Sequence, residues 1–158
     1  QEQKDPALLD TLFRSRMMGL FGFGTLHGKL LTERVSLYPR EVLAAARRNI
    51  PVYKRYRHLL SEDCYHLTPP AGSAEAWQAV EFCKRDGSEA ALLAFRNGST
   101  QPLYRVRFQG LQPNARYRVR SENNGTETIG TGAKLIQEGI VIALPAARMS
   151  ELLVLTCM

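Results

Sequence analysis

The main pattern in this chain is a helical repeat of apolar positions in residues 36–60. Steps of three and four residues place these positions on one face of a single amphipathic helix: Val42, Ala46, Asn49 or Ile50, Tyr53, Tyr56 and Leu60. Pro39 suits the first turn, because its missing N–H would have no partner there. Pro51 interrupts the pattern, but the repeat resumes in phase after it. We therefore expect a kink at residues 49–51 and not the end of the helix.

The residues before this helix follow a different pattern. Residues 7–16, ALLDTLFRSR, carry apolar side chains at helical spacing and predict a short helix. Residues 17–24, MMGLFGFG, form a continuous apolar run bounded by glycines, which is typical of a strand buried on both faces. The order helix, buried strand, loop, long helix is a piece of a repeating α/β architecture with too few strands to stand alone.

After Leu60 the apolar period falls to about two. Short alternating segments separated by turn residues predict strands in residues 64–67, 76–83, 89–96, 103–111, 116–122, from 127 onward, 140–144 and 151–156. About eight short strands of this kind predict a mainly β fold, an antiparallel, Greek-key-like β-sandwich. We therefore expect two parts, residues 1–60 and residues 61–158, with the seam at residues 60–63.

The positive charge of the chain is concentrated on the long helix. The formal net charge is +6, and residues 34–57 alone hold seven Lys or Arg against one Glu. One alternative is therefore a basic interaction module, in which an acidic partner contacts Arg47, Arg48, Arg55 and Arg57. No DNA- or RNA-binding motif accompanies these residues, and no apolar run reaches the roughly 18 residues that span a membrane. We expect neither a nucleic-acid nor a membrane partner.

Recognisable catalytic and metal-binding motifs are absent from the sequence. It has no nucleophile elbow, phosphate loop, zinc motif or EF-hand loop, so we expect no catalytic residue, no metal and no cofactor. His27 follows the predicted buried strand, where barrel enzymes place their active-site loops, and is a candidate sugar contact. Trp77 is the second candidate, because it could form a stacking surface for sugars with Tyr65, Tyr104 and Tyr117. Strand alternation nevertheless favours burial of most of these aromatic rings.

Acidic residues gather at two places in the second part of the chain. Glu81, Asp86 and Glu89 surround one predicted hairpin, and Glu62 and Asp63 lie at the seam. A retaining glycosidase needs two carboxyl groups about 5 Å apart. We interpret both groups as exposed charges and not as such a pair.

A series of short motifs, in a fixed order, resembles one known family. The matching residues are Phe21-Gly22, then Ser36, Glu41, Tyr53-Lys54 and Arg57 in the long helix, then Gly110-Leu111, Tyr117-Arg118-Val119, Gly130, Gly132 and Leu135. Their order is similar to the C-terminal end of melibiase-type α-galactosidases of glycoside hydrolase clan D. In that family a catalytic (β/α)₈ barrel ends in a strand, a loop and a long helix, and an antiparallel β-sandwich follows.

The resemblance implies that this chain is the noncatalytic C-terminal part of a retaining α-galactosidase-like enzyme, with a sandwich that stabilises the barrel. The family's catalytic aspartates lie on earlier barrel strands, and nothing here matches them. The implied partners are the missing catalytic barrel and, for the whole enzyme, an α-galactoside substrate. The isolated chain would expose residues 17–23 and the apolar stripe of residues 42–56, so we expect self-association through that surface.

Two expectations stand beside this interpretation. One is an autonomous carbohydrate-binding sandwich that uses Trp77 and exposed tyrosines. The other concerns the compartment: the three cysteines form no C-x-x-C pair, which is typical of thiols in a reducing compartment, and we expect a cytoplasmic protein.

Overall fold

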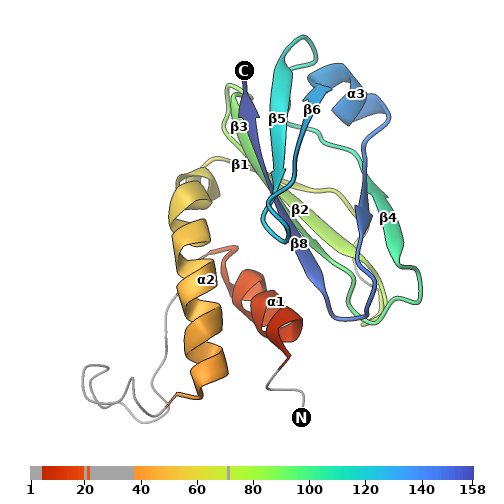
Figure 1. Cartoon of the computed structure of the whole chain (residues 1–158). Coiled ribbons are helices and arrows are strands. Elements are labelled where there is room, and N and C mark those ends of the chain that lie inside the picture. Colours follow the sequence, from red (N-terminus) through yellow and green to blue (C-terminus); the bar gives the residue numbers. More distant parts are fainter. Residues whose placement is uncertain (1–4, 20, 22–37, 71) are drawn as a thin grey trace.

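Three stacked layers make up the part of the chain that can be described. The structure, a computed structural model, describes residues 5–19, 21, 38–70 and 72–158. Two helices form the first layer, a six-stranded antiparallel sheet the second, and a two-stranded sheet with a short helix the third (Figure 1). The predicted antiparallel β-sandwich of eight strands is therefore confirmed for the described residues, and a helical layer covers one of its outer faces.

The helical layer consists of α1, Pro6–Arg16, and α2, Arg40–Tyr56, which continues into the 3₁₀ turn η4, Arg57–Ser61. Asp5 caps α1 by accepting a hydrogen bond from the N–H of Ala7 at 2.9 Å. As predicted, α2 runs through Pro51 without ending. Pro39 is the N-cap of α2, one position before the predicted first turn. No helix in the described ranges is both long and apolar enough to cross a membrane.

The predicted buried strand in residues 17–24 is replaced by a turn where the chain can be described. Met17, Met18 and Gly19 turn away from the end of α1, and residues 20 and 22–24 lie outside the described part. The side chain of Met17 is fully buried, because it packs in the cluster under the helices. The apolar pattern thus predicted the burial of Met17 but not its backbone conformation.

The six-stranded sheet has two strands buried on both faces. Its order is β1 (Asp63–His66), β2 (Gln78–Cys83), β3 (Glu89–Phe95), β8 (Ser150–Cys157), β5 (Arg116–Ser121) and β6 (Glu127–Thr131), and all pairs are antiparallel. In β3, Leu92 faces the two-stranded sheet and Leu93 faces the helices. Central strands therefore carry continuous apolar runs, whereas β5, near the edge, alternates buried and exposed residues.

The two-stranded sheet closes the sandwich. It pairs β4, Leu103–Val106, with β7, Ile140–Ala143, and α3, Gly132–Gln137, lies beside it. Strand β4 is shorter than the predicted residues 103–111, because the chain leaves the sheet after Val106 and is held elsewhere at Gln109 and Gly110. The space between the two sheets holds a core that includes Val106, Phe108 and Tyr117.

Candidate functional site

The helical layer and the six-stranded sheet meet over a continuous apolar cluster, which we call the helix–sheet joint. The helices contribute Leu9, Phe13, Met17, Ala45, Ala46, Tyr56 and Leu59, and the sheet contributes Phe82, Ala91, Leu93, Phe95 and Leu152. All of these side chains are buried. Truncating one large side chain of this kind to Ala costs about 3–5 kcal/mol, so the helices are firmly docked on the sheet.

A buried arginine fastens α1 to the sheet beside this cluster. Arg14 is 4% exposed. Its Nη1 donates to the Oδ1 of Asn123 at 2.6 Å and to the carbonyl of Ser150 at 2.9 Å. Thr11 adds a bond of 2.9 Å from its Oγ1 to the Oγ of Ser150. One helix is thus tied both to the β5–β6 turn and to the start of β8.

Burial and neighbouring carboxylates shift the pKa of Arg14 in opposite directions. Burial lowers the pKa of its guanidinium, while the negative charges of Glu151, Asp10 and Glu122 raise it. Arginine stays protonated in proteins, so the cost of burying its charge has to be offset by such partners. The guanidinium therefore positions the two layers and does not exchange protons.

A second ion pair connects α2 to the same region of the sheet. Arg55 Nη2 lies 2.6 Å from Glu122 Oε2, and the Glu122 side chain is only 7% exposed. The two helices are also tied to each other, because Asn49 Nδ2 donates to Asp10 Oδ1 at 2.6 Å and Arg48 Nη2 lies 2.9 Å from the same oxygen. The predicted stripe of α2 therefore includes a polar residue, Asn49, that has a partner for its amide.

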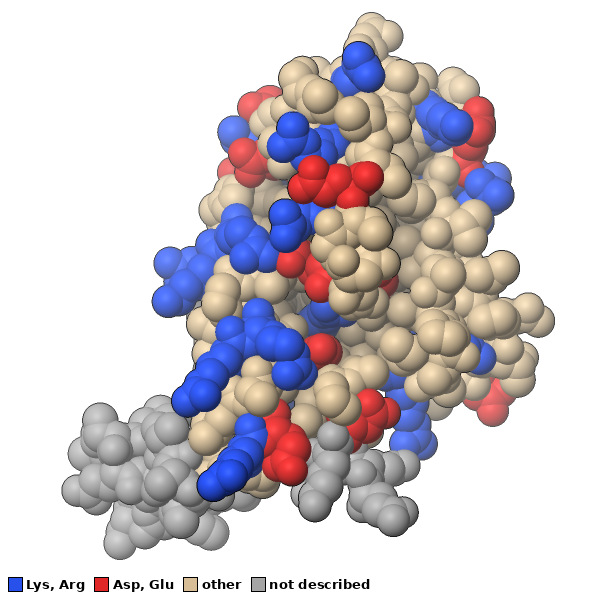
Figure 2. All heavy atoms as spheres, in the orientation of Figure 1, with Lys and Arg blue, Asp and Glu red and all other residues tan. Residues whose placement is uncertain are grey.

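The basic face of α2 points away from the joint. Figure 2 shows Lys and Arg side chains gathered along the side of the molecule that α2 occupies in Figure 1. Arg47, Arg48, Arg55 and Arg57, the residues of the predicted basic module, are all exposed. Two of them, Arg48 and Arg55, pair with carboxylates of this chain, which reduces the charge they offer to a partner.

The apolar stripe of α2, which we expected to be exposed, is largely covered within the chain. Ala46 and Tyr56 are buried against α1 and the sheet, while Val42, Ile50 and Tyr53 are half-buried. The covering helix α1 and the outer face of the sheet both come from this chain, so the stripe needs no second copy to be shielded. Self-association stays a prediction.

The interior of the sandwich contains two carboxylates, and one of them corrects the sequence interpretation. We expected Glu81 to be an exposed charge, but it is fully buried. Its Oε2 accepts from the N–H of Gln109 at 2.8 Å and its Oε1 from the N–H of Gly110 at 3.1 Å. Burial raises the pKa of Glu81, and these two hydrogen bonds partly oppose the rise. Glu81 therefore clamps the chain after β4.

Glu81 and Glu151, the second interior carboxylate, are too far apart to act as a glycosidase pair. They lie on β2 and β8 with β3 between them. Along the strand direction, Glu81 is two residues away from the position directly opposite Glu151. Two strand spacings and two residues separate their Cα atoms by roughly 12 Å. Carboxyl groups of retaining enzymes are about 5–5.5 Å apart. In addition, the two carboxylates have different partners, because Glu81 accepts from Gln109 after β4 and Glu151 accepts from Ser121 at the end of β5.

The two candidate sugar contacts stay predictions. His27 lies outside the described residues. Trp77 is 6% exposed, stacks on Tyr104 with ring centroids 5.4 Å apart, and donates its Nε1–H to the carbonyl of Gln101 at 3.0 Å. The structure does not bring Trp77, Tyr65 and Tyr117 onto one exposed face, because Tyr117 is fully buried between the sheets.

Metal chemistry finds no support in the described ranges. They contain no group of three or more His, Cys, Asp or Glu side chains placed to hold a metal ion.

The residues that sequence reasoning missed are Arg14, Glu122 and Asn123 of the joint. Asn49 gave the only advance signal of polar contacts there, as a polar residue on an otherwise apolar stripe.

One protein family matches this chain over half of its length. Residues 77–155 match the family described as the glycosyl hydrolase family 36 C-terminal domain. The matched region includes all of β2, most of β8 and every strand between them. No curated protein sequence matches the chain.

Solved structures of α-galactosidases are similar to it. The α-galactosidase AgaB from Geobacillus stearothermophilus has 26% identity and a TM-score of 0.65, over 92% of this chain and 18% of that one. AgaA from the same organism, solved in complex with raffinose, has 24% identity and a TM-score of 0.68, over 92% and 19%. The α-galactosidase from Lactobacillus brevis has 21% identity and a TM-score of 0.63, over 79% and 18%. This chain spans less than a fifth of each of these structures.

Proposed function

Because this chain belongs to the glycosyl hydrolase family 36 C-terminal domain family, we propose that it is the noncatalytic C-terminal part of an α-galactosidase-like glycoside hydrolase and stabilises the catalytic barrel. In this proposal residues 1–60, which include α1, α2 and most of η4, are the end of the barrel, and residues 61–158 are the sandwich that follows it. The helix–sheet joint is then the contact between barrel and sandwich.

The extent of the structural similarity supports this division. A match over 92% of the chain has to include most of the helical layer, because the strands begin only at Asp63. Most of the helical layer therefore has a counterpart in AgaB together with the sandwich. A separate binding module would need no such helices in the same arrangement.

The observation that carries the proposal is the buried network around Arg14. A guanidinium that is 4% exposed and bonded to Asn123 and Ser150 binds no substrate, because no substrate can reach it. Its geometry instead holds two layers in one fixed orientation. A barrel whose last helices are held in this way is stabilised at its end without any contribution of the sandwich to the reaction.

The test compares this chain with the full-length enzyme on an aryl α-galactoside. We expect turnover by the full-length enzyme and none by the chain alone, since the chain lacks the catalytic aspartates of the family. Turnover by the 158-residue chain would refute the noncatalytic role. A full-length enzyme inert on every α-glycoside would refute the enzymatic assignment.

Self-association of the isolated chain is a secondary part of the proposal. Its surface is the half-buried portion of the α2 stripe, Val42, Ile50 and Tyr53, because the rest is covered by α1 and the sheet. Light scattering should show an average mass that rises with concentration. A constant monomeric mass at high concentration would contradict this part alone.

A further inference from the structure

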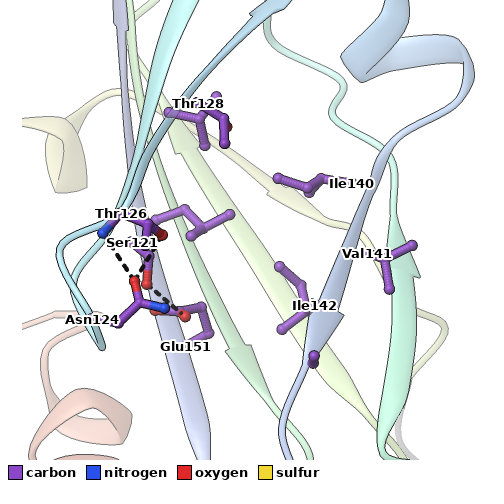
Figure 3. Close-up of a pocket in the computed structure, with 11 residues that line it drawn as sticks. Ser121, Asn124, Thr126, Thr128, Ile140, Val141, Ile142 and Glu151 are labelled. Atoms are coloured by element: carbon purple, nitrogen blue, oxygen red, sulfur yellow. Dashed lines mark hydrogen bonds between the residues drawn. The ribbon is translucent and has the colours of Figure 1, made fainter.

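A pocket opens between the two sheets of the sandwich, away from the helix–sheet joint. Its volume is about 210 Å³. One wall comes from β5, β6, the turn that joins them, and β8; the other comes from β7 (Figure 3). The pocket is smaller than the roughly 300–1,000 Å³ of sites for drug-sized ligands, so it has room for a single ring.

Polar side chains gather on the first wall. Figure 3 shows Ser121, Asn124, Thr126 and Glu151 close together at one end of the pocket, with Thr128 farther along the same wall. Glu151 is 9% exposed and is held in place by Ser121, whose Oγ donates to its Oε2 at 2.9 Å. Asn124 Oδ1 accepts from the N–H and the Oγ1 of Thr126, so the orientation of its amide is fixed.

The opposite wall is apolar and ends in an edge of β7 that pairs with no other strand in the described part of the chain. Ile140 and Ile142 of β7 face the polar group across the pocket. Leu144 donates its N–H toward β4, to the carbonyl of Pro102 at 2.9 Å. Backbone groups alternate between the two edges of a strand, so those of Val141 and Ala143 point away from β4 and toward the pocket. They add donors and acceptors to an otherwise apolar surface.

The charges around the pocket exclude most other ligand classes. Among its lining residues, all within the described part of the chain, none is Lys, Arg or His, so an anion would meet only the carboxylate of Glu151. A cation is disfavoured as well, because the positive charge of Arg14 already acts on Glu151. A purely apolar ligand would cover the exposed side chains of Asn124, Thr126 and Thr128 without offering them hydrogen bonds.

An uncharged ring with hydroxyls along one edge and C–H groups on one face satisfies both walls. We infer that this pocket binds one pyranose ring of a galactoside: Glu151, Asn124 and Thr128 bond to its hydroxyls, and Ile140 and Ile142 pack on its C–H face. The choice of a galactoside rests on the proposed function. The pocket is then a second, noncatalytic sugar site, separate from the barrel.

An NMR titration of the ¹⁵N-labelled chain with methyl α-galactopyranoside tests the inference. Saturable shift changes are expected at the amides of Ser121, Asn124, Thr128, Val141 and Ala143. The absence of saturable changes there would overturn it. So would changes centred on Trp77 and Tyr104, which would place the sugar at the stacked aromatic pair.

Two variants with a matched control sharpen the test. Thr128→Phe fills the pocket and should abolish binding, whereas Ile129→Phe adds the same ring on the opposite face of β6 and should leave binding unchanged. Asn124→Asp keeps the acceptor for Thr126 but removes the amide donor, and should weaken binding at least tenfold. Equal loss of binding in Ile129→Phe, or unchanged binding in Thr128→Phe, would overturn the site.

The outcome is separable from that of the proposed function. An active full-length enzyme whose C-terminal chain shows no shift changes would remove the pocket site and keep the proposed function. Sugar binding by the chain together with an inert full-length enzyme would keep the site and remove the enzymatic assignment.

Discussion

Glu81 lies in the apolar interior of the sandwich, and its carboxylate accepts hydrogen bonds from two consecutive backbone N–H groups, those of Gln109 and Gly110. Burial raises its pKa, as it does that of Glu151. A carboxyl group whose pKa is raised by folding binds protons more tightly in the folded state. Its contribution to stability is complete below the unfolded pKa of about 4.5 and is lost as the pH rises through the folded pKa.

We predict that Glu81→Gln flattens the fall in stability as the pH increases from about 4.5 upward. Glutamine resembles the protonated carboxyl group and carries no charge to be penalised by burial. Urea unfolding of the whole chain at a series of pH values measures this. Asp86→Asn is the matched control: Asp86 is exposed in the adjacent turn and its pKa is lowered by hydrogen bonds from Ser88, so the fall should be unchanged. An identical fall in Glu81→Gln and the unmodified chain would contradict the prediction.

The sequence interpretation of Glu81 as an exposed charge is wrong, although strand alternation is compatible with its inward position. The pattern places Trp77, Ala79 and Glu81 on one side of β2, as the structure confirms. The hydrogen-bond partners of Glu81 are the N–H groups of Gln109 and Gly110, almost thirty positions away along the chain. Local sequence contains no signal for such a contact. A charged residue on an inward face is therefore the feature that local reasoning misreads.

At the scale of elements, α2 shows where local rules hold and where packing overrides them. The rule for proline predicted a disturbance at Pro51, and the helix nevertheless continues to Tyr56. Both sides of the proline are anchored, because Ala46 and Asn49 before it and Tyr56 after it are buried in the joint. Tertiary contacts thus hold a helix that the proline alone would weaken by about 3 kcal/mol.

We predict that Pro51→Ala stabilises the chain by about 1–3 kcal/mol, since alanine restores a backbone donor and has the highest helix propensity. Pro51 is exposed, so the substitution leaves no cavity in the joint. Urea unfolding measures the change. Lys54→Ala, on the exposed side of the same helix, should alter stability by less than about 0.5 kcal/mol. A loss of stability in Pro51→Ala would show that the joint requires the geometry that proline imposes.

The strands and helices were largely predictable because their patterns are local. The segments predicted as strands in residues 89–96, 116–122 and 151–156 correspond to β3, β5 and β8. The layer order was not predictable, because it depends on which faces pair. The joint combines residues from both ends of the chain, as the contact of Arg14 with Ser150 illustrates. The pocket combines residues 119–128 with residues 140–153, which come from separate strands.

At the scale of the whole molecule, one central sheet is packed on both faces, by helices on one side and by the second sheet on the other (Figure 1). The two clusters are separate, so a change on one face need not disturb the other. In the proposed function the helical face joins the barrel, and the sandwich face carries the pocket. Apolar substitutions on one face can therefore leave the other face intact, whereas Arg14 links the two faces, because its charge acts on Glu151 of the pocket.

The central claim is that the helix–sheet joint stabilises the enzyme without taking part in its reaction, and Arg14→Leu in the full-length enzyme tests it most directly. Removing the guanidinium leaves Asn123 and Ser150 with fewer hydrogen-bond partners. The expected loss in the free energy of unfolding is about 2–4 kcal/mol. Arg16→Leu, at the exposed end of the same helix, is the control.

The measurement is the half-life of α-galactosidase activity at an inactivating temperature, taken together with kcat/KM at 25 °C. We predict that Arg14→Leu shortens the half-life at least tenfold, which corresponds to about 1.4 kcal/mol, with kcat/KM equal to that of Arg16→Leu. An unchanged half-life, or a tenfold loss of kcat/KM at an unchanged half-life, would contradict the account.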